Sequence, residues 1–199
     1  GDKKNAQALA RNTIEALQNY DHVVIPSGSC AGMLIKHYPD LFADDEKWQQ
    51  AANDLSQRTY ELTQFLVDVL KFTPNASCPH SLTYHDSCSS RREVGVIEQP
   101  RQLLSAVNGL KLQEMEETEI CCGFGGTFCV KYPDVSTKMV SDKTANIQAT
   151  GAEMLAAGDM GCLMNITGRL KREGSQVQAY HIAEVLAGMT DQPGIGEEN

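Results

Sequence analysis

The chain has 199 residues, 41% of them hydrophobic and 22% charged, which is enough for one large domain or two small ones. The formal net charge of −9 argues against a nucleic-acid-binding protein, because such a protein needs clustered Lys and Arg. No apolar run approaches the ~20 residues of a membrane span, and the start has no signal-peptide pattern. We therefore expect a cytoplasmic protein without membrane insertion.

The first part of the chain predicts helices around one short strand. In chain order the predicted elements are a helix over 6–20, a short buried strand over 22–26, a helix over 31–37 and a long helix over 44–72. The acidic residues at 44–46 suit the N-terminus of the long helix. The loop over 73–79 is the best candidate for a domain boundary.

After this loop, predicted strands and helices alternate. In chain order they are a strand over 82–85, a helix over 100–107, a strand over 110–115, helices over 136–149 and 163–172, a strand over 177–180 and a helix over 182–188. Residues 153–157 fit either a strand end or a continued helix. Alternation of this kind predicts an α/β fold with short, mostly parallel sheets.

A weak internal repeat divides the chain. Residues 8–34 and 140–166 both run from a helix through a short segment to Gly, Cys and an apolar pair, which makes Cys30 equivalent to Cys162. We therefore expect two pseudo-repeated α/β units with cysteines at the loop ends of strands. The expected domains are the remainder of a first repeat over 1–75, a complete second repeat over 80–190 and a flexible tail over 191–199. The opening cysteines of the first repeat are expected to be missing.

Seven cysteines are many for a chain with no sign of export, and an odd number does not suit a disulfide framework. They occupy positions 30, 78, 88, 121, 122, 129 and 162. Metal ligation, catalysis and scattered buried thiols are the remaining explanations. Cys78 and Cys129 are best explained as small apolar residues.

The segment Cys121-Cys-Gly-Phe-Gly-Gly126 carries most of the chemical information. Vicinal cysteines in an extended strand point to opposite faces. The three glycines allow positive φ, so that both thiolates can face one centre and backbone N–H groups can reach sulfur. Cys88 follows a predicted strand, where α/β folds place functional residues, and Cys162 opens a helix. We therefore expect these four cysteines to converge on one metal centre.

Together these motifs resemble the cysteine-rich (CCG) domain family, which includes the CCG-containing subunit of heterodisulfide reductase. The matching segments are Pro26–Met33, Tyr84–Cys88, Gln99–Arg101, Cys121–Phe128, Gly161–Asn165 and His181–Leu186. The resemblance implies that Cys88, Cys121, Cys122 and Cys162 bind an iron–sulfur cluster of the [4Fe–4S] type. Within the family the pattern is most similar to the members that serve lactate utilisation. It implies an electron-transfer subunit of an oxidoreductase complex that oxidises L-lactate to pyruvate, with other iron–sulfur subunits as partners.

Two departures from the family pattern limit this interpretation. Heterodisulfide reductase has a fifth cysteine three residues after the counterpart of Cys162, where this chain has Asn165. Cys30 is a possible ligand only of an incomplete first site. Possible supporting residues around the main centre are His85, Asp86, Gly123, Gly125, Gly126 and Asn165.

Two rival interpretations remain open. Four thiolates also satisfy tetrahedral zinc, which would make the chain a zinc-stabilised interaction module. A strained vicinal disulfide at Cys121–Cys122 would instead indicate a thiol–disulfide oxidoreductase related to heterodisulfide reductase. No catalytic residue and no site for a 2-hydroxy acid can be identified. His181, ahead of an apolar helix, is expected to be a cap or a buried hydrogen-bonding residue.

Overall fold

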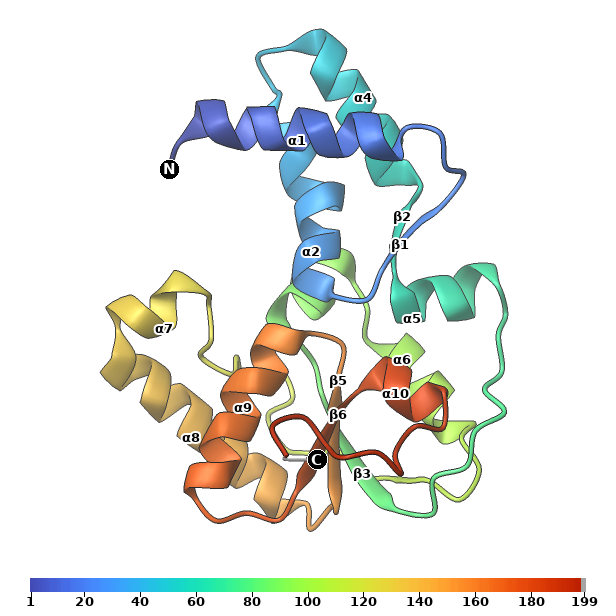
Figure 1. Cartoon of the computed structure of the whole chain (residues 1–199), viewed down its shortest axis with the longest axis vertical. Helices are drawn as coiled ribbons and strands as arrows, with labels where there is room; N and C mark the ends of the chain where they lie inside the picture. The colour runs from blue at the N-terminus through green and yellow to red at the C-terminus, as the bar shows by residue number, and fades with distance from the viewer. Residues whose placement is uncertain (198–199) are drawn as a thin grey trace.

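Two parallel sheets organise the chain in the computed structural model, which describes residues 1–197 (Figure 1). The first sheet is the pair β1–β2, and the second has four strands in the order β4-β3-β5-β6. Every strand pair in both sheets is parallel. The predicted α/β fold with short parallel sheets is confirmed.

The first region runs from α1 to a π-helical turn, η2. Its elements are α1 (Lys3–Leu17), β1 (Val23–Ile25), α2 (Gly28–Gly32), η1 (Met33–His37), α3 (Tyr38–Leu41), α4 (Glu46–Gln57), β2 (Thr59–Glu61), α5 (Leu62–Gln64) and η2 (Phe65–Val69). Their buried apolar side chains form a core between α1, η1, α3 and α4, which includes Ile14, Phe42 and Leu55.

The single helix predicted over 44–72 is wrong in its middle. Helix α4 ends at Gln57, and residues 59–61 form β2, whose register pairs Val23 with Thr59 and Ile25 with Glu61. Thr59 and Tyr60 favour a strand. The apolar side chains at 55, 60 and 66 resemble one helical face in the sequence, but they belong to three elements. A tertiary contact therefore overrode the local pattern.

The second region contains the larger sheet. Its elements are β3 (Ser81–His85), η3 (Ser90–Val94), α6 (Glu98–Ser105), β4 (Lys111–Leu112), α7 (Thr127–Lys131), α8 (Pro133–Ala149), β5 (Met154–Ala157), α9 (Met160–Arg172), β6 (Gln178–His181) and α10 (Ile182–Leu186). Residues 153–157, which fitted two structures, contain the central strand β5. The strand predicted over 110–115 is shortened to two residues, and α7 was not predicted.

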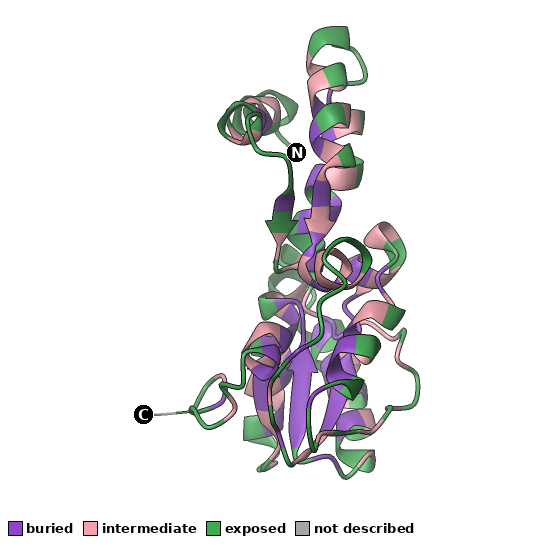
Figure 2. Ribbon diagram, turned by 90° about the vertical axis from the view of Figure 1, so that its right-hand side faces the viewer, coloured by how far each residue is buried: buried purple, intermediate pink, exposed green. Residues whose placement is uncertain are grey.

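Helices cover both faces of the larger sheet, so its central strand β5 is buried on both sides (Figure 2). Alternate residues of β5 point to opposite faces. Met154 and Ala156 pack with α6 and α10, whereas Leu155 and Ala157 pack with α8 and α9. This double cover explains why β5 is an unbroken apolar run rather than an alternating one.

The two regions repeat one plan and meet where their strands end. Each has a strand, a helix that contains a cysteine, a parallel strand and a further helix. These are β5-α9-β6-α10 in the second region and β1-α2-β2-α5 in the first, where η1, α3 and α4 are inserted between α2 and β2. His181 caps α10 through Nδ1, which accepts from Ala183 N at 3.1 Å, as its position predicted. Its Nε2 lies 2.8 Å from the carbonyl oxygen of Pro26, so this cap also joins the two regions.

The C-terminal residues lie against the larger sheet. Ile195 N donates to Ala179 O at 2.7 Å, and the Ile195 side chain packs on the core beside α9. Residues 198–199 are outside the described part of the chain, and the flexibility of the tail stays a prediction. Within residues 1–197, no helix combines the length and the apolar character needed to cross a membrane.

Candidate metal centre

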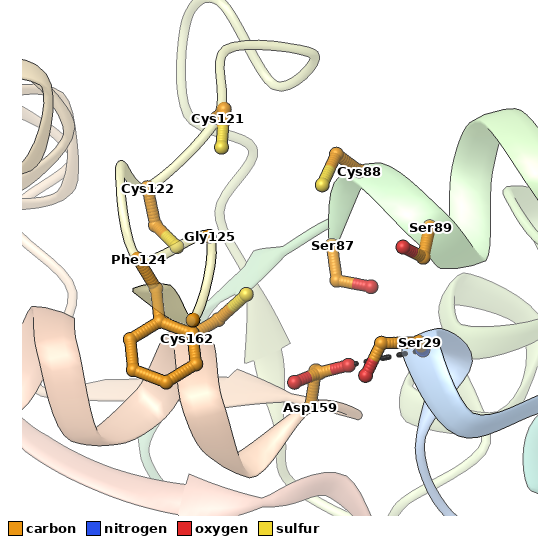
Figure 3. Close-up of a pocket in the computed structure, with 11 residues that line it drawn as sticks. Ser29, Ser87, Cys88, Ser89, Cys121, Cys122, Phe124, Gly125, Asp159 and Cys162 are labelled. Atoms are coloured by element: carbon orange, nitrogen blue, oxygen red, sulfur yellow. Dashed lines mark hydrogen bonds between the residues drawn. The ribbon is translucent and has the colours of Figure 1, made fainter. Parts of the chain in front are cut away.

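A pocket of about 300 Å³ lies at the carboxyl ends of β3 and β5, and all four predicted cysteines line it (Figure 3). Cys88 comes from the turn after β3, Cys121 and Cys122 from the glycine-rich loop, and Cys162 from the first turn of α9. The carboxyl ends of parallel strands are the usual place for a ligand in an α/β sheet. The expected convergence of these thiols is therefore present, and their role as ligands stays a prediction.

A buried ion pair fastens the turn that carries Cys88. The Asp86 side chain is 1% exposed, and Arg101 donates to both of its carboxylate oxygens at 3.0 and 2.9 Å. Arg101 also pairs with Glu114, at 2.8 Å. Its pKa rises because of the hydrogen bonds to Asp86, so it stays a cation. This two-point contact fixes the direction in which the chain leaves β3.

The loop over 121–126 turns tightly because its glycines adopt positive φ. The φ angles of Gly123, Gly125 and Gly126 are 80°, 53° and 59°, as the sequence predicted. A Cβ on Gly123 would lie 2.8 Å from the carbonyl oxygen of Ser136, so helix α8 leaves no room for a side chain. Gly123 N donates to Cys121 Sγ at 3.4 Å. This is the backbone-to-sulfur contact that we expected from the loop.

Two neighbouring side chains hold this loop against α8 and α9. Ser136 Oγ donates to Gly123 O at 2.8 Å, and Asn165 Nδ2 donates to Cys122 O at 2.9 Å. Asn165 therefore supports the loop through its backbone, in the position where heterodisulfide reductase has a further cysteine.

Phe124 lies along α9 and lines the pocket beside Cys162 (Figure 3). The ring fits only because residue 161 is glycine: a Cβ there would be 2.6 Å from the nearest ring atom. An aromatic ring in this position limits the access of water, and a drier site has a lower dielectric constant.

The four thiols are crowded, and this raises the pKa of two of them, Cys88 and Cys122. A hydrogen bond with the Cys121 thiol, followed by burial, raises the pKa of Cys88. The Cys121 thiol lowers the pKa of Cys122, but the Cys162 thiol and burial raise it more, to about 12. Several thiolates therefore do not coexist here without a cation. Metal binding supplies that cation and releases the thiol protons.

His85, the last residue of β3, lies beneath these thiols. Burial, together with the nearby Lys143 cation, lowers its pKa to about 3, so the imidazole is neutral. Lys143 is fully buried on α8, and its Nζ donates to Glu117 O at 3.0 Å. Sequence reasoning missed this lysine. The signal was its place between Val140 and Ile147 on the buried face of the helix.

A polar wall faces the cysteines across the pocket. Asp159, which is N-terminal to α9, accepts from Gly161 N at 3.2 Å and from both Ser27 Oγ and Ser29 N at 3.1 Å. One carboxylate thus contacts the start of α9 and the start of α2 (Figure 3). The sequence analysis missed Asp159, although an Asp just before a predicted helix is a common capping residue.

The other three cysteines lie outside the pocket. Cys30 is exposed on α2, and its role as a ligand of an incomplete first site stays a prediction. Cys78 is a buried thiol 3.8 Å from Met154 Sδ, which agrees with a filler role. Cys129 Sγ donates to Gly126 O at 3.0 Å and so follows the glycine-rich loop without joining the pocket.

The donor set fits a soft or borderline metal. Thiolate and imidazole are typical ligands of iron–sulfur clusters and zinc, whereas magnesium and calcium select oxygen. The pocket offers four sulfur atoms. Next to two of them, Cys122 Sγ and Cys162 Sγ, lies the buried ring of His85, whose two nitrogens have no partner among residues 1–197. A metal centre would satisfy both features.

Comparison with known proteins agrees with this geometry. The model of the cysteine-rich CCG domain matches residues 82–167, which begin in β3, contain the four pocket cysteines and end in α9. The chain is 49% identical over 187 residues to "Lactate utilization protein A" of Shouchella clausii, covering 94% of this chain and 78% of that protein.

Two further relatives have the same name. "Lactate utilization protein A" of Oceanobacillus iheyensis is 48% identical, over 94% of this chain and 76% of its own length. "Lactate utilization protein A 2" of Bacillus cereus strain AH820 is 44% identical, over 94% of this chain and 78% of its own length. Similarity of this degree over most of both chains places the protein in the lactate utilization protein A family.

Proposed function

We propose that the protein is an iron–sulfur electron-transfer subunit of a system that oxidises L-lactate to pyruvate. One observation carries the proposal: Cys88, Cys121, Cys122 and Cys162, from three separate segments, line a single pocket. The names of the relatives supply the metabolic context. Partner proteins with further iron–sulfur centres would complete the path from lactate to the electron acceptor.

An iron–sulfur cluster held by the four thiolates would supply one-electron redox chemistry in this pocket. The chain's own part is to hold and tune it. The Gly123 N–H group contacts Cys121 Sγ, and Phe124 limits the access of water. Burial lowers the pKa of Lys143, and the nearby Cys122 and Cys121 oppose this shift, so the Lys143 cation and the thiolates of these cysteines stabilise one another. The N–H contact and the cation both stabilise added electrons and thus raise the reduction potential.

The test is the iron, acid-labile sulfide and zinc content of anaerobically purified protein, together with its visible spectrum. We expect a brown protein with about four iron and four sulfide per chain. Cys122→Ser should lose both elements and the colour. Cys129→Ser is the matched control, because it removes a thiol of the neighbouring helix α7 that does not line the pocket. Equal metal loss in both variants, or none in Cys122→Ser, would refute this assignment.

A zinc-stabilised module is the second candidate, and one observation favours it. A ring nitrogen of His85 and the sulfur atoms of Cys122 and Cys162 lie within 4.8 Å of one another, which suits a single ion. This candidate predicts one zinc per chain, no colour after anaerobic reconstitution and loss of folding with chelators. The same elemental analysis therefore separates the two candidates.

A further inference from the structure

His85 is a fully buried histidine with two unsatisfied ring nitrogens. Neither Nδ1 nor Nε2 has a hydrogen-bond partner within residues 1–197. Buried polar side-chain atoms in folded proteins are nearly always paired with protein or water, because an unpaired one costs free energy. A ring with both nitrogens unpaired therefore indicates a missing interaction partner.

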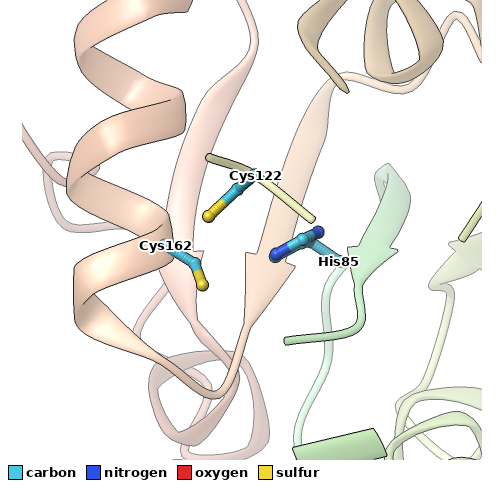
Figure 4. Close-up of side chains that lie close together, drawn as sticks. All are labelled: His85, Cys122 and Cys162. Carbon is cyan, nitrogen blue, oxygen red and sulfur yellow. The ribbon is translucent and has the colours of Figure 1, made fainter. Parts of the chain in front are cut away.

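The ring faces two of the pocket thiols (Figure 4). One ring nitrogen, Cys122 Sγ and Cys162 Sγ all lie within 4.8 Å of one another. Both cysteines are nearly as buried as the histidine, at 2% and 7% exposed. A transition-metal ion bonds to imidazole nitrogen at about 2.0–2.1 Å and to thiolate sulfur at about 2.3 Å, so one ion can draw these three atoms together.

We propose that His85 is a ligand of the metal centre, with one ring nitrogen bonded beside the thiolates of Cys122 and Cys162. The centre then has mixed nitrogen and sulfur ligation rather than thiolate ligation alone. In a four-iron cluster, which takes one protein ligand per iron, His85 takes the place of Cys88 or Cys121, while Cys122 and Cys162 remain ligands. The inference rests on the proposed function only in placing a metal in this pocket. Imidazole suits iron as well as zinc, and its substitution for thiolate raises the potential of an iron–sulfur centre.

The surroundings of His85 offer little else for its nitrogens. Lys143, the nearby cation, donates to Glu117 O and lies 3.8 Å from Met115 Sδ, and an ammonium group cannot accept a hydrogen bond. The carboxylate of Asp159, the nearby anion, already accepts hydrogen bonds from residues at the starts of α2 and α9. The neutral imidazole keeps a lone pair, and the two thiols are the ligand atoms next to it.

The first experiment uses metal-free protein and Co²⁺, whose absorption reports the ligands. Wild type should give a spectrum of mixed sulfur and nitrogen ligation. Loss of an outer-shell partner costs 10–100-fold in metal affinity, so His85→Ala, which removes a direct ligand, should lower Co²⁺ affinity by about 100-fold or more. His85→Cys should restore affinity and strengthen the sulfur-to-cobalt absorption. His80→Gln is the matched control, since His80 pairs with Glu153 at the other end of β3.

The second experiment keeps the native side chain and therefore does not depend on a variant that folds. The protein is labelled with ¹⁵N-histidine, loaded with iron and sulfide, reduced and examined by pulsed electron paramagnetic resonance. A coupling typical of directly bonded nitrogen, absent from His85→Cys and kept in His80→Gln, is the expected result. A coupling as weak as that of an N–H···S hydrogen bond, or none, overturns the inference.

The two proposals fail in different ways. If iron and sulfide bind and depend on Cys122, but no histidine nitrogen is coupled, the ligand role of His85 is wrong and the iron–sulfur function stands. If no iron–sulfur cluster forms and Co²⁺ binds with a histidine nitrogen that His85→Cys removes, the iron–sulfur function is wrong and His85 is a ligand of a mononuclear site.

Discussion

The two halves of the molecule repeat one strand–helix–strand–helix plan, but only the second gathers a group of thiols. Cys30 is the third residue of α2, and Cys162 is the third residue of α9. Cys162 is 7% exposed and meets Cys122, whereas Cys30 is exposed and lies apart from the pocket. The repeated plan provides one cysteine at a strand end. The turn after β3 and the loop over 121–126 provide the other three.

The halves also differ in how their charged groups are fixed. In the second half, Asp86 is buried and bound at two points by Arg101. In the first half, Lys3 and Asp44 form a pair whose side chains are 57% and 85% exposed. Exposed pairs contribute little to stability, because water screens them and side-chain entropy opposes them. The stability of the second half should therefore depend much more on its ion pair.

The largest expected effect comes from breaking the buried pair. Arg101→Met leaves the Asp86 carboxylate buried with only Arg91, 3.6 Å away, and should lower the free energy of unfolding by about 3 kcal/mol. Lys3→Met, the control, should change it by less than about 0.5 kcal/mol. Urea unfolding of the metal-free proteins measures both. Similar changes in the free energy of unfolding of the two variants would show that the buried pair and the exposed pair contribute equally to stability.

A smaller effect is expected where the two halves meet. The equivalent residues before α2 and α9 are Ser27 and Asp159, and the carboxylate of Asp159 contacts both helix starts. Ser27 caps no helix through its side chain. Asp159→Ala should therefore cost about 2 kcal/mol, at the upper end for a lost cap, and Ser27→Ala about 0.5 kcal/mol.

Thermal and urea unfolding of the two variants test this asymmetry. Asp159→Asn is the matched control, because its side-chain oxygen still accepts a hydrogen bond from Gly161 N. Its amide nitrogen cannot accept the hydrogen bonds from Ser27 Oγ and Ser29 N, so the variant should recover less than half of the loss. An Asp159→Ala variant as stable as Ser27→Ala would mean that the shared carboxylate does not hold the two halves together.

The sequence predicted the second half better than the first, for a physical reason. The apolar pattern of Ile182–Leu186 suits a buried helix, and the glycines of Cys121–Gly126 indicate a tight turn. By contrast, β2 is three residues long and exists because β1 pairs with it. Likewise, the roles of Asp159 and Lys143 depend on contacts with distant segments. Local sequence does not encode such contacts.

The smallest expected effect concerns two glutamates, one in each half, whose carboxyl groups respond to pH in opposite directions. Burial raises the pKa of Glu61, the cap of α5, above 4.5 despite its hydrogen bonds to Thr63 and Gln64. Hydrogen bonds from Ser81 and His80 lower the pKa of Glu153, at the exposed start of β5, to about 2.

The direction of each pH effect follows from which state binds the proton more tightly. The folded state binds the proton of Glu61 more tightly than the unfolded state does. The contribution of Glu61 to stability is therefore full below pH 4.5 and is lost as the pH rises through the raised pKa. For Glu153, the unfolded state binds the proton more tightly. The contribution of Glu153 to stability is therefore present above pH 4.5 and is lost as the pH falls toward 2. Glu61→Gln should therefore gain stability relative to wild type as the pH rises above 4.5, whereas Glu153→Gln should be less stable than wild type at pH 7 and approach it in acid. Urea unfolding of metal-free protein between pH 3 and pH 8 gives both differences, and slopes of the same sign would show that burial does not dominate at Glu61.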